Sequence, residues 1–241
     1  MTRQFRDWLM ICAAFLIFGV IMITITYGWE VYKASQNTPL PQEEEVPIIY
    51  DSPIQDPANY VEQVDPLPEF PSGDEFAAAV SFLRAYGYDV SIHELLDCMN
   101  YSDTNFVEAY VGDARTDYGY CMTPALVICM NNYLADIGGQ IRTQNMDGMS
   151  IEAISDYLNS NHPMIVWYTN DHEQPRYTGV TYNNVFRVYK NAEVLVIYGI
   201  QDGVVAAMDP NDGVIGIPID EFKSIWQACG SQAIGVYYVN L

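Results

Sequence analysis

Cysteine and histidine most often carry nucleophilic chemistry, and this 241-residue sequence has five of the first and three of the second. A catalytic cysteine acts as a thiolate, and a neighbouring imidazole must take its proton and later protonate the leaving amine. His93, His162 and His172 lie in a short helical segment and in two polar turns, so we expect all three on the surface. No C-x-x-C or His/Cys spacing indicates a zinc site. The spacing of thiols and imidazoles alone therefore assigns no active site.

The cysteines differ in their surroundings along the chain. Cys12 lies within an apolar N-terminal run, and Cys129 lies in an apolar helical run where we expect a buried free thiol. Cys98, Cys121 and Cys229 lie in the part of the chain that we expect to be exported, where disulfides can form. A Cys98–Cys121 disulfide stays an open alternative, because spacing alone does not determine pairing.

Helical patterns come first along the rest of the chain, and strand patterns follow. Helical periodicity predicts four helices, at 74–87, 91–100, 122–135 and 150–160. Ser91 and Glu94 have the spacing of a capping box at the start of the second helix. β-branched and aromatic runs predict five strands, at 163–168, 193–198, 204–208, 214–218 and 233–239. This order predicts an α+β fold with a mostly antiparallel sheet.

The sequence is strongly acidic, with 31 Asp and Glu against 10 Lys and Arg and a formal net charge of −21. A negative surface repels phosphate backbones and anionic lipids, so we expect no nucleic-acid partner and no membrane adhesion by the folded domain. Half of the residues are hydrophobic, which is enough to bury a core and excludes a disordered chain. The first 34 residues hold three basic and two acidic residues, so the remainder carries −22.

Residues 1–34 are predicted to form a transmembrane anchor. No residue from Trp8 to Trp29 is charged, and these 22 residues are long enough to cross roughly 30 Å of hydrocarbon as a helix. Arg3 and Arg6 precede the run, which predicts a cytoplasmic N-terminus and an extracytoplasmic remainder. A cleaved signal peptide is the alternative, but its apolar core usually has about 7–15 residues and no A-x-A site follows here.

Residues 35–65 are predicted to form an extended, acidic stalk. The sequence from 35 to 66 reads SQNTPLPQEEEVPIIYDSPIQDPANYVEQVDP, with six prolines and the acidic run Glu43–Glu45. Proline removes a backbone donor and fixes φ, and like charges extend a chain by repulsion. The residues that follow, 66–241, are predicted to form one globular domain.

Four blocks of this domain stand in a recognisable order. Pro-Ser-Gly precedes the first helix in LPEFPSGDEFAAAVSFLRAYGYDVSIHELL at 67–96, and the middle block is FVEAYVGDARTDYGYCMTPALVICMNNYL at 106–134. The strand block is NHPMIVWYTN at 161–170, and the last is EVLVIYGIQDGVVAAMDPNDG at 193–213. Together they resemble papain-like cysteine peptidases, most closely the bacteriocin-processing endopeptidase-like group, cysteine peptidase family 39. The resemblance covers about residues 60–241 and implies a papain-like fold, with a helical lobe on an antiparallel sheet.

The resemblance also shows where this sequence departs from the catalytic pattern of the family. The family has Cys-Glu after Pro-Thr/Ser-Gly, and Asp74-Glu75 stands there in this sequence. The position of the family's histidine is held by Glu193, whereas Asp209 of an Asp-Pro pair keeps the third position. Gln63 is the candidate for the oxyanion-stabilising glutamine. Because neither a thiol nor an imidazole stands at its position, we expect no cysteine-peptidase activity.

Three functions are open to a cleft in which Asp74, Glu193 and Asp209 converge. The first is a pseudopeptidase, anchored in the membrane and extracytoplasmic, that binds peptide or protein and needs no cofactor. The second is a site for a divalent ion such as Ca²⁺, which prefers carboxylate oxygens. The third is a hydrolase in which carboxylates act as acid and base, because close carboxylates raise each other's pKa. We take the first as the working hypothesis.

Overall fold

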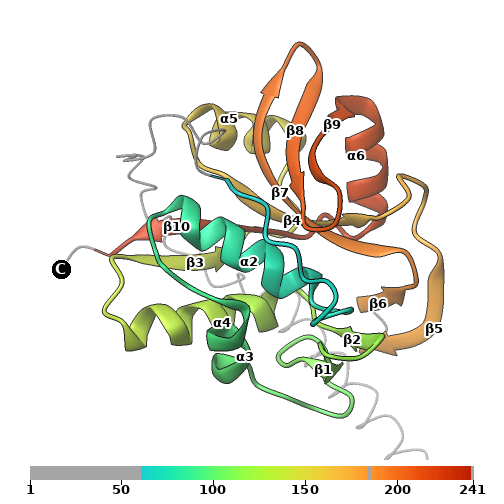
Figure 1. Ribbon diagram of the computed structural model, residues 1–241. Helices are drawn as coiled ribbons and strands as arrows, with labels where there is room; N and C mark the ends of the chain where they lie inside the picture. Colours follow the sequence, from blue (N-terminus) through green and yellow to red (C-terminus); the bar gives the residue numbers. More distant parts are fainter. Residues whose placement is uncertain (1–60, 184–185, 240–241) are drawn as a thin grey trace, which may run out of the picture. The chain divides into compact units, whose positions relative to one another are not determined.

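Figure 1 shows the computed structural model, which describes residues 61–183 and 186–239. The described residues belong to one compact unit, Ile49–Leu241. The predicted membrane anchor, with its apolar run at 8–29, and nearly all of the predicted stalk lie outside the described residues. Within the described part of the chain, none of the helices has the length and apolarity needed to cross a bilayer.

The N-terminal part of the described chain forms a layer of helices. α2 (Asp74–Ala85) is almost entirely buried and packs on the central sheet, with α3 (Ile92–Cys98) and α4 (Thr123–Asp136) beside it (Figure 1). The Ser91 hydroxyl accepts a hydrogen bond from the Glu94 amide, and the Glu94 carboxylate accepts one from the Ser91 amide. This reciprocal pair confirms the predicted capping box at the start of α3.

The central sheet has six strands in the order β3-β10-β4-β7-β8-β9, and all neighbouring strands are antiparallel. In chain order the strands are β3 (Ile141–Asn145), β4 (Met164–Thr169), β7 (Ala192–Gln201), β8 (Val204–Asp209), β9 (Gly213–Pro218) and β10 (Ala233–Tyr238). The turn between β7 and β8 is Asp202-Gly203, with φ of 52° and 78°, the left-handed pair that a two-residue hairpin favours. The predicted α+β fold with an antiparallel sheet is confirmed.

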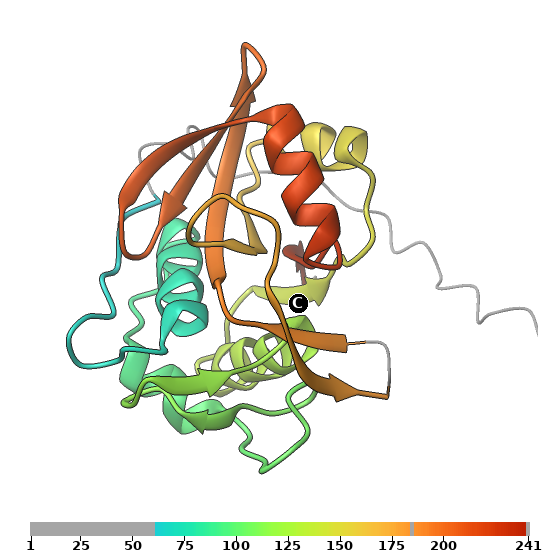
Figure 2. The same ribbon diagram turned by 90° about the vertical axis from the view of Figure 1, so that its right-hand side faces the viewer.

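Helices cover both faces of this sheet and create two cores. α5 (Ile151–Asn159) and α6 (Ile219–Ala228) pack on the face opposite α2 and α4 (Figures 1 and 2). Successive strand side chains point to opposite faces. Trp167 of β4 therefore joins the core beneath α2, whereas Tyr168, the next residue, joins the core beneath α6. The near-continuous apolar sequence of β4 follows from this double coverage.

Two short hairpin-like sheets complete the fold beside the helical layer. Their strands are β1 (Val111–Asp113) with β2 (Tyr118–Tyr120), and β5 (Tyr177–Tyr182) with β6 (Phe186–Tyr189). A small apolar cluster joins them, in which the ring of Phe106 contacts the rings of Tyr120 and Tyr182. This contact brings the β5–β6 pair next to the segment that leads into α4.

The predicted helices and strands are confirmed in place and type to within a few residues. Sequence patterns missed β1, β2, β3, β5, β6 and α6. β1 and β2 have three residues each, which is too short for a periodic signal, and β3 is largely polar. For α6 the signal was present, since Phe222, Ile225 and Trp226 recur at helical spacing and are all buried.

The expected surface position is wrong for His162, which is 2% exposed. Its ring packs against those of Tyr86, Tyr157 and Tyr238, and its Nδ1 lies 3.3 Å from the Tyr86 hydroxyl. The neighbouring polar residues indicated a turn, but the ring of Tyr157 in the preceding helix and the rings of Tyr86 and Tyr238, far along the chain, bury it. The side chains of His93 and His172 are 58% and 38% exposed, as expected.

The four cysteines of the described chain are all free thiols. Cys121, Cys129 and Cys229 are buried, and Cys98 is half-buried. The expectation of a buried free thiol at Cys129 is confirmed, and the Cys98–Cys121 disulfide is not formed.

We predict that Phe76→Ala strongly destabilises the domain. Phe76 is fully buried in α2 with its ring 5.1 Å from that of Tyr110, so truncation leaves a cavity between α2 and its neighbours. The expected loss in free energy of unfolding is about 3–5 kcal/mol, measured by urea denaturation. Val214→Ala, at a side chain that is 69% exposed, is the control and should change stability by less than about 0.5 kcal/mol. Equal urea midpoints for the two variants would contradict this account of the core.

Candidate functional site

Asp74 is the first residue of α2 and follows Gly73 directly. The first N–H groups of a helix have no partners within it, and the helix dipole favours a negative group there. Oδ1 of Asp74 accepts a hydrogen bond of 3.4 Å from Nδ2 of Asn211. The start of α2 thus presents this carboxylate to the turn that follows β8.

Glu193 accepts a hydrogen bond from the same side-chain amide of Asn211. It is the second residue of β7 and is 3% exposed. Its Oε1 accepts a 3.3 Å hydrogen bond from the Val194 amide, and its Oε2 accepts a 3.1 Å hydrogen bond from Nδ2 of Asn211. A side-chain amide has two N–H donors. Asn211 can therefore satisfy Asp74 and Glu193 at once, and we call this arrangement the Asn211 bridge.

Asp209 and Gln63 hold the turn that carries Asn211. Oδ1 of Asp209 accepts hydrogen bonds from the backbone amides of Asn211, at 2.7 Å, and Asp212, at 3.0 Å. Nε2 of Gln63 donates to the carbonyl oxygens of Pro210, at 2.9 Å, and Asn211, at 3.4 Å. The candidate oxyanion glutamine is thus close to the site, but its amide donors are directed to this backbone.

The structure brings together all four residues that the sequence singled out. Asp74 and Glu193 share the Asn211 bridge, while Asp209 and Gln63 fix the turn beneath it. Among residues 61–183 and 186–239, no group of three or more His, Cys, Asp or Glu side chains is arranged to hold a metal ion. The calcium alternative therefore has no geometric support in this part of the chain and stays a prediction.

Three carboxyl groups, those of Asp74, Glu75 and Glu193, have pKa values above their usual range. Burial, opposed by the hydrogen bond from Asn211 and reinforced by the charge of Asp209, raises the pKa of Asp74 to about 6. Burial also raises the pKa of Glu193 well above its usual value, with further contributions from the charges of Asp74 and Asp209. For Glu75, burial and the charge of Asp74 raise the pKa to about 8. Burial and the neighbouring negative charges both disfavour the ionised form of these carboxyl groups.

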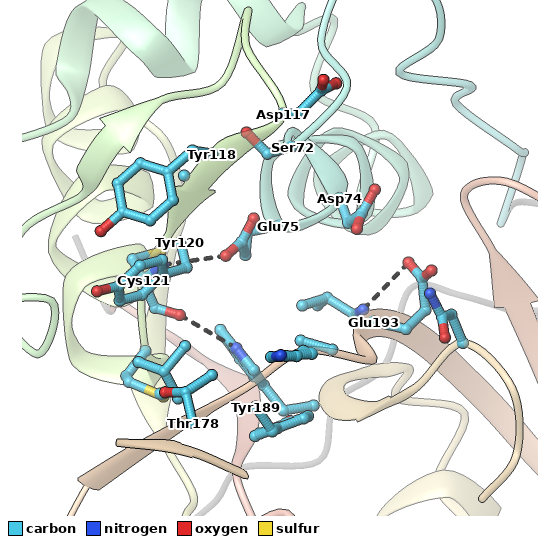
Figure 3. A pocket seen from close by; sticks show the side chains of 18 of the residues that line it. Ser72, Asp74, Glu75, Asp117, Tyr118, Tyr120, Cys121, Thr178, Tyr189 and Glu193 are labelled. Carbon is cyan, nitrogen blue, oxygen red and sulfur yellow. Dashed lines mark hydrogen bonds between the residues drawn. The ribbon is translucent and has the colours of Figure 1, made fainter. Parts of the chain in front are cut away.

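A cavity of about 420 Å³ opens beside the Asn211 bridge (Figure 3). Asp74 and Glu75 reach it from the start of α2, and Glu193 reaches it from β7. Its other walls come from the β1–β2 pair, the segment that leads into α4, β4 and the β5–β6 pair, and they include Asp117, Tyr118, Tyr120, Cys121, Trp167, Thr178, Tyr189 and Lys190.

Cys121 is the one thiol among the residues that line the cavity, although it is distant from Asp74 along the chain. It lines the cavity with Glu75, and its backbone amide donates a 3.0 Å hydrogen bond to Oε1 of Glu75. Its carbonyl accepts a 3.2 Å hydrogen bond from the indole of Trp167. The thiol is buried, burial raises its pKa well above the usual value, and no histidine lines the cavity. The raised pKa keeps Cys121 a thiol, whereas a nucleophile needs the thiolate.

Sequence reasoning missed two residues that shape the site. Asn211 was not singled out, because an asparagine after Asp-Pro has the usual signature of a turn. Glu75 follows the substituted nucleophile position, and its polar type gave no sign that it would be 7% exposed. Only the packing of α2 against the segment around Cys121 explains that burial.

The fold and the position of the site define a class of protein. In the papain-like arrangement, a buried helix packs on an antiparallel sheet. The site lies where the start of that helix meets the sheet, which here is the beginning of β7. A family model described as "Peptidase_C39 like family" matches residues 55–234, which is most of the chain. The protein therefore belongs to the Peptidase_C39-like family.

Three solved structures are similar to this chain to different degrees. A structure described as a putative C39-like peptidase from Bacillus anthracis has a TM-score of 0.65 and 22% identity, covering 75% of this chain and 95% of that chain. The double glycine motif protease of an AMS/PCAT transporter, solved with a leader peptide, has a TM-score of 0.44 and 13% identity, covering 75% of this chain and 94% of that chain. The peptidase domain of Streptococcus ComA has a TM-score of 0.44 and 14% identity, with 75% and 100% coverage. The first similarity shows the fold alone, and no curated protein sequence matches.

We predict that the stability of the domain falls as the pH rises from about 5 to 9. Unfolded carboxyls release their protons near pH 4–4.5, whereas folded Asp74 and Glu75 keep theirs up to about pH 6 and 8. The folded state then binds more protons than the unfolded state across this window, so raising the pH favours unfolding. Urea denaturation at a series of pH values measures the slope.

Glu75→Gln should flatten this slope and raise stability at the alkaline end. Glutamine keeps the acceptor for the Cys121 amide without the buried charge, and we expect a gain of roughly 1–3 kcal/mol near pH 9. Asp156→Asn is the matched control, because Asp156 is exposed on α5. A wild-type slope that Glu75→Gln leaves unchanged would argue against these pKa shifts.

Proposed function

We propose that this protein is an inactive papain-like domain that binds peptide. The Asn211 bridge is the observation that carries the proposal. A cysteine peptidase needs a thiolate and an imidazole that exchange a proton at this place. Here a neutral amide joins two carboxylates, and an amide neither takes nor gives a proton near neutral pH.

The cavity supports the binding part of the proposal. It lies directly beside the bridge, is open to solvent at Tyr118, which is 59% exposed, and is lined by aromatic and polar side chains. Pockets of this volume and lining bind small ligands or single side chains of a peptide. The family to which the chain belongs is named for its peptidase members, which supports a peptide as the ligand.

We further propose that residues 1–34 anchor the protein in a membrane with its C-terminal domain on the extracytoplasmic side. The uncharged run from Trp8 to Trp29 and the preceding Arg3 and Arg6 support this topology. The strongly acidic remainder of the chain suits a domain that does not adhere to anionic lipids.

The raised pKa of Asp74, to about 6, favours one alternative, in which the carboxylates act as general acid and base. Such a hydrolase would work without a thiol. Hydrolysis that resists a thiol alkylator and disappears in Asp74→Asn would support this alternative over the inactive domain.

We predict that the full chain cleaves no peptide in a thiol-dependent manner, and that Asp74→Cys combined with Glu193→His introduces such cleavage. The double variant places a thiol at the start of α2 and an imidazole at the start of β7, and Asn211 can still contact the latter. The measurement is cleavage of a pooled peptide substrate, with and without iodoacetamide.

Asp74→Ser with Glu193→His is the control for this experiment, since it restores the imidazole without a thiol. Iodoacetamide-sensitive cleavage by the wild-type chain would refute the inactive domain. Failure of the double variant would show that the groove, and not only the pair of side chains, differs from that of an active enzyme.

We predict that the full chain stays with the membrane fraction after an alkaline carbonate wash, and that a variant without residues 8–29 does not. Protease added outside intact cells should remove the C-terminal domain of the full chain. Release of the full chain by carbonate, or protection of its C-terminal domain from external protease, would contradict the proposed anchor or its orientation.

A further inference from the structure

The cavity beside the Asn211 bridge has an unbalanced charge. Four carboxyl side chains reach it, from Asp74, Glu75, Asp117 and Glu193. The one cationic side chain among its lining residues is Lys190, which is exposed. Among residues 61–183 and 186–239, none of these four carboxylates forms an ion pair with a lysine, arginine or histidine. The walls thus carry four acidic groups to which the described residues supply no ion-pair partner.

Glu75 is the residue that distinguishes this cavity from an exposed acidic patch. It is 7% exposed, and its carboxylate points into the cavity from the start of α2 (Figure 3). The Cys121 amide donates to its Oε1, but no side chain of the described residues donates a hydrogen bond to it. A buried carboxyl without a charged partner costs free energy, and a ligand that supplied that partner would recover it.

Aromatic rings accompany the carboxylates at the wall of the cavity. The rings of Tyr118 and Tyr120 lie edge to face with centroids 5.7 Å apart, and Tyr118 is largely exposed. Carboxylates beside the faces of aromatic rings favour ammonium and guanidinium groups, which gain ion pairing and cation–π contact together. An acidic or purely apolar side chain would leave Glu75 without a cationic partner.

We propose that this cavity binds one basic side chain, lysine or arginine, of a peptide that lies across the Asn211 bridge. Glu75 is the inner carboxylate for the cation, and Asp117 with the Tyr118 ring forms the outer wall. The inference rests on the proposed peptide-binding function and adds the chemical class of the peptide. The proposed cation site determines which peptides bind, and it involves no catalytic step.

The geometry couples binding of a cation to release of a proton. An empty cavity favours protonated Glu75, because its pKa is raised to about 8, and a cation favours the ionised form. The other titratable groups that face Glu75 are Asp74 on α2, Tyr110, Cys121 and Tyr189. Burial raises the pKa of Tyr110, Cys121 and Tyr189, so these three stay neutral, and Asp74 is ionised above about pH 6. Glu75 is therefore expected to change charge between pH 6 and 9, and Glu193, which lines the same cavity from β7, also has a raised pKa, so Glu75→Gln distinguishes the two groups.

The test uses four nonapeptides with chemically blocked termini. All four have the same flanking glycine and alanine residues and differ only at the central residue, which is Arg, Lys, norleucine or Glu. Calorimetric titration of the full chain at about 0.15 M salt limits non-specific attraction to its acidic surface. We expect the Arg and Lys peptides to bind about tenfold tighter than the norleucine peptide near pH 9, and to lose most of that advantage near pH 6. Proton release should appear as a binding enthalpy that depends on the buffer.

Glu75→Gln and Asp156→Asn each remove one carboxyl and form the matched pair. Glu75→Gln should abolish the preference for basic peptides and its pH dependence, whereas Asp156→Asn, exposed on α5, should leave both within about twofold. If the Glu75→Gln variant does not unfold cooperatively, and so is not properly folded, the pH dependence of peptide affinity in the wild-type chain tests the cation site instead.

Each outcome of this experiment has a separate meaning. Three results would overturn the cation site and leave the peptide-binding function unaffected. They are equal affinity for the norleucine and basic peptides, an equal loss of the preference for basic peptides in the two variants, and an affinity for basic peptides that does not increase between pH 6 and 9. Absence of binding by all four peptides would overturn the peptide-binding function and this inference with it. Cleavage of a peptide would overturn catalytic inactivity alone.

Discussion

The candidate site depends on the hydrogen bonds of one side-chain amide. Nδ2 of Asn211 donates to Asp74 at the start of α2 and to Glu193 at the start of β7, two carboxylates that would otherwise repel each other. The amide can reach both because Asp209 accepts two backbone hydrogen bonds within the turn and Gln63 holds the turn from outside. Neutral donors between two acids stabilise the junction of helix and sheet without a nucleophile. The arrangement links the helix start to the sheet through the side chains of Asn211, Asp74 and Glu193.

Burial of acids around this bridge sets the electrostatic character of the site. Asp74, Glu75 and Glu193 all have raised pKa values because they leave water for the region between α2 and the sheet. The first N–H groups of α2 and the amides of Asn211, Val194 and Cys121 offset part of that cost. Protons and a cationic ligand would then compete for the same oxygens. Stability, proton uptake and ligand choice are for this reason linked at one place in the molecule.

Much of the fold could be predicted because its elements are periodic or locally capped. The Ser91–Glu94 capping box and the apolar runs of β4 and β7 are signals within a few neighbouring residues. β1 is too short for a periodic signal, and the polar strand β3 takes its position from β10, a partner far along the chain. The burial of His162 among Tyr86, Tyr157 and Tyr238 was misjudged for the same reason. Of the site, Asp74, Glu193, Asp209 and Gln63 were singled out, whereas Asn211 and the role of Glu75 were not.

The sequence by itself determined which side chains stand at the matched positions, because residue type is a local property. Asp74 and Glu193 lack a thiol and an imidazole in any conformation. Only the tertiary structure decided what surrounds these two side chains. Asn211 follows Asp74 by 137 positions, and Cys121 follows Glu75 by 46, yet each contacts its partner. Hydrogen bonding and desolvation act over a few ångströms in space, so the bridge, the buried charge of Glu75 and the cavity between them exist only once α2, β7 and the turn after β8 have packed together.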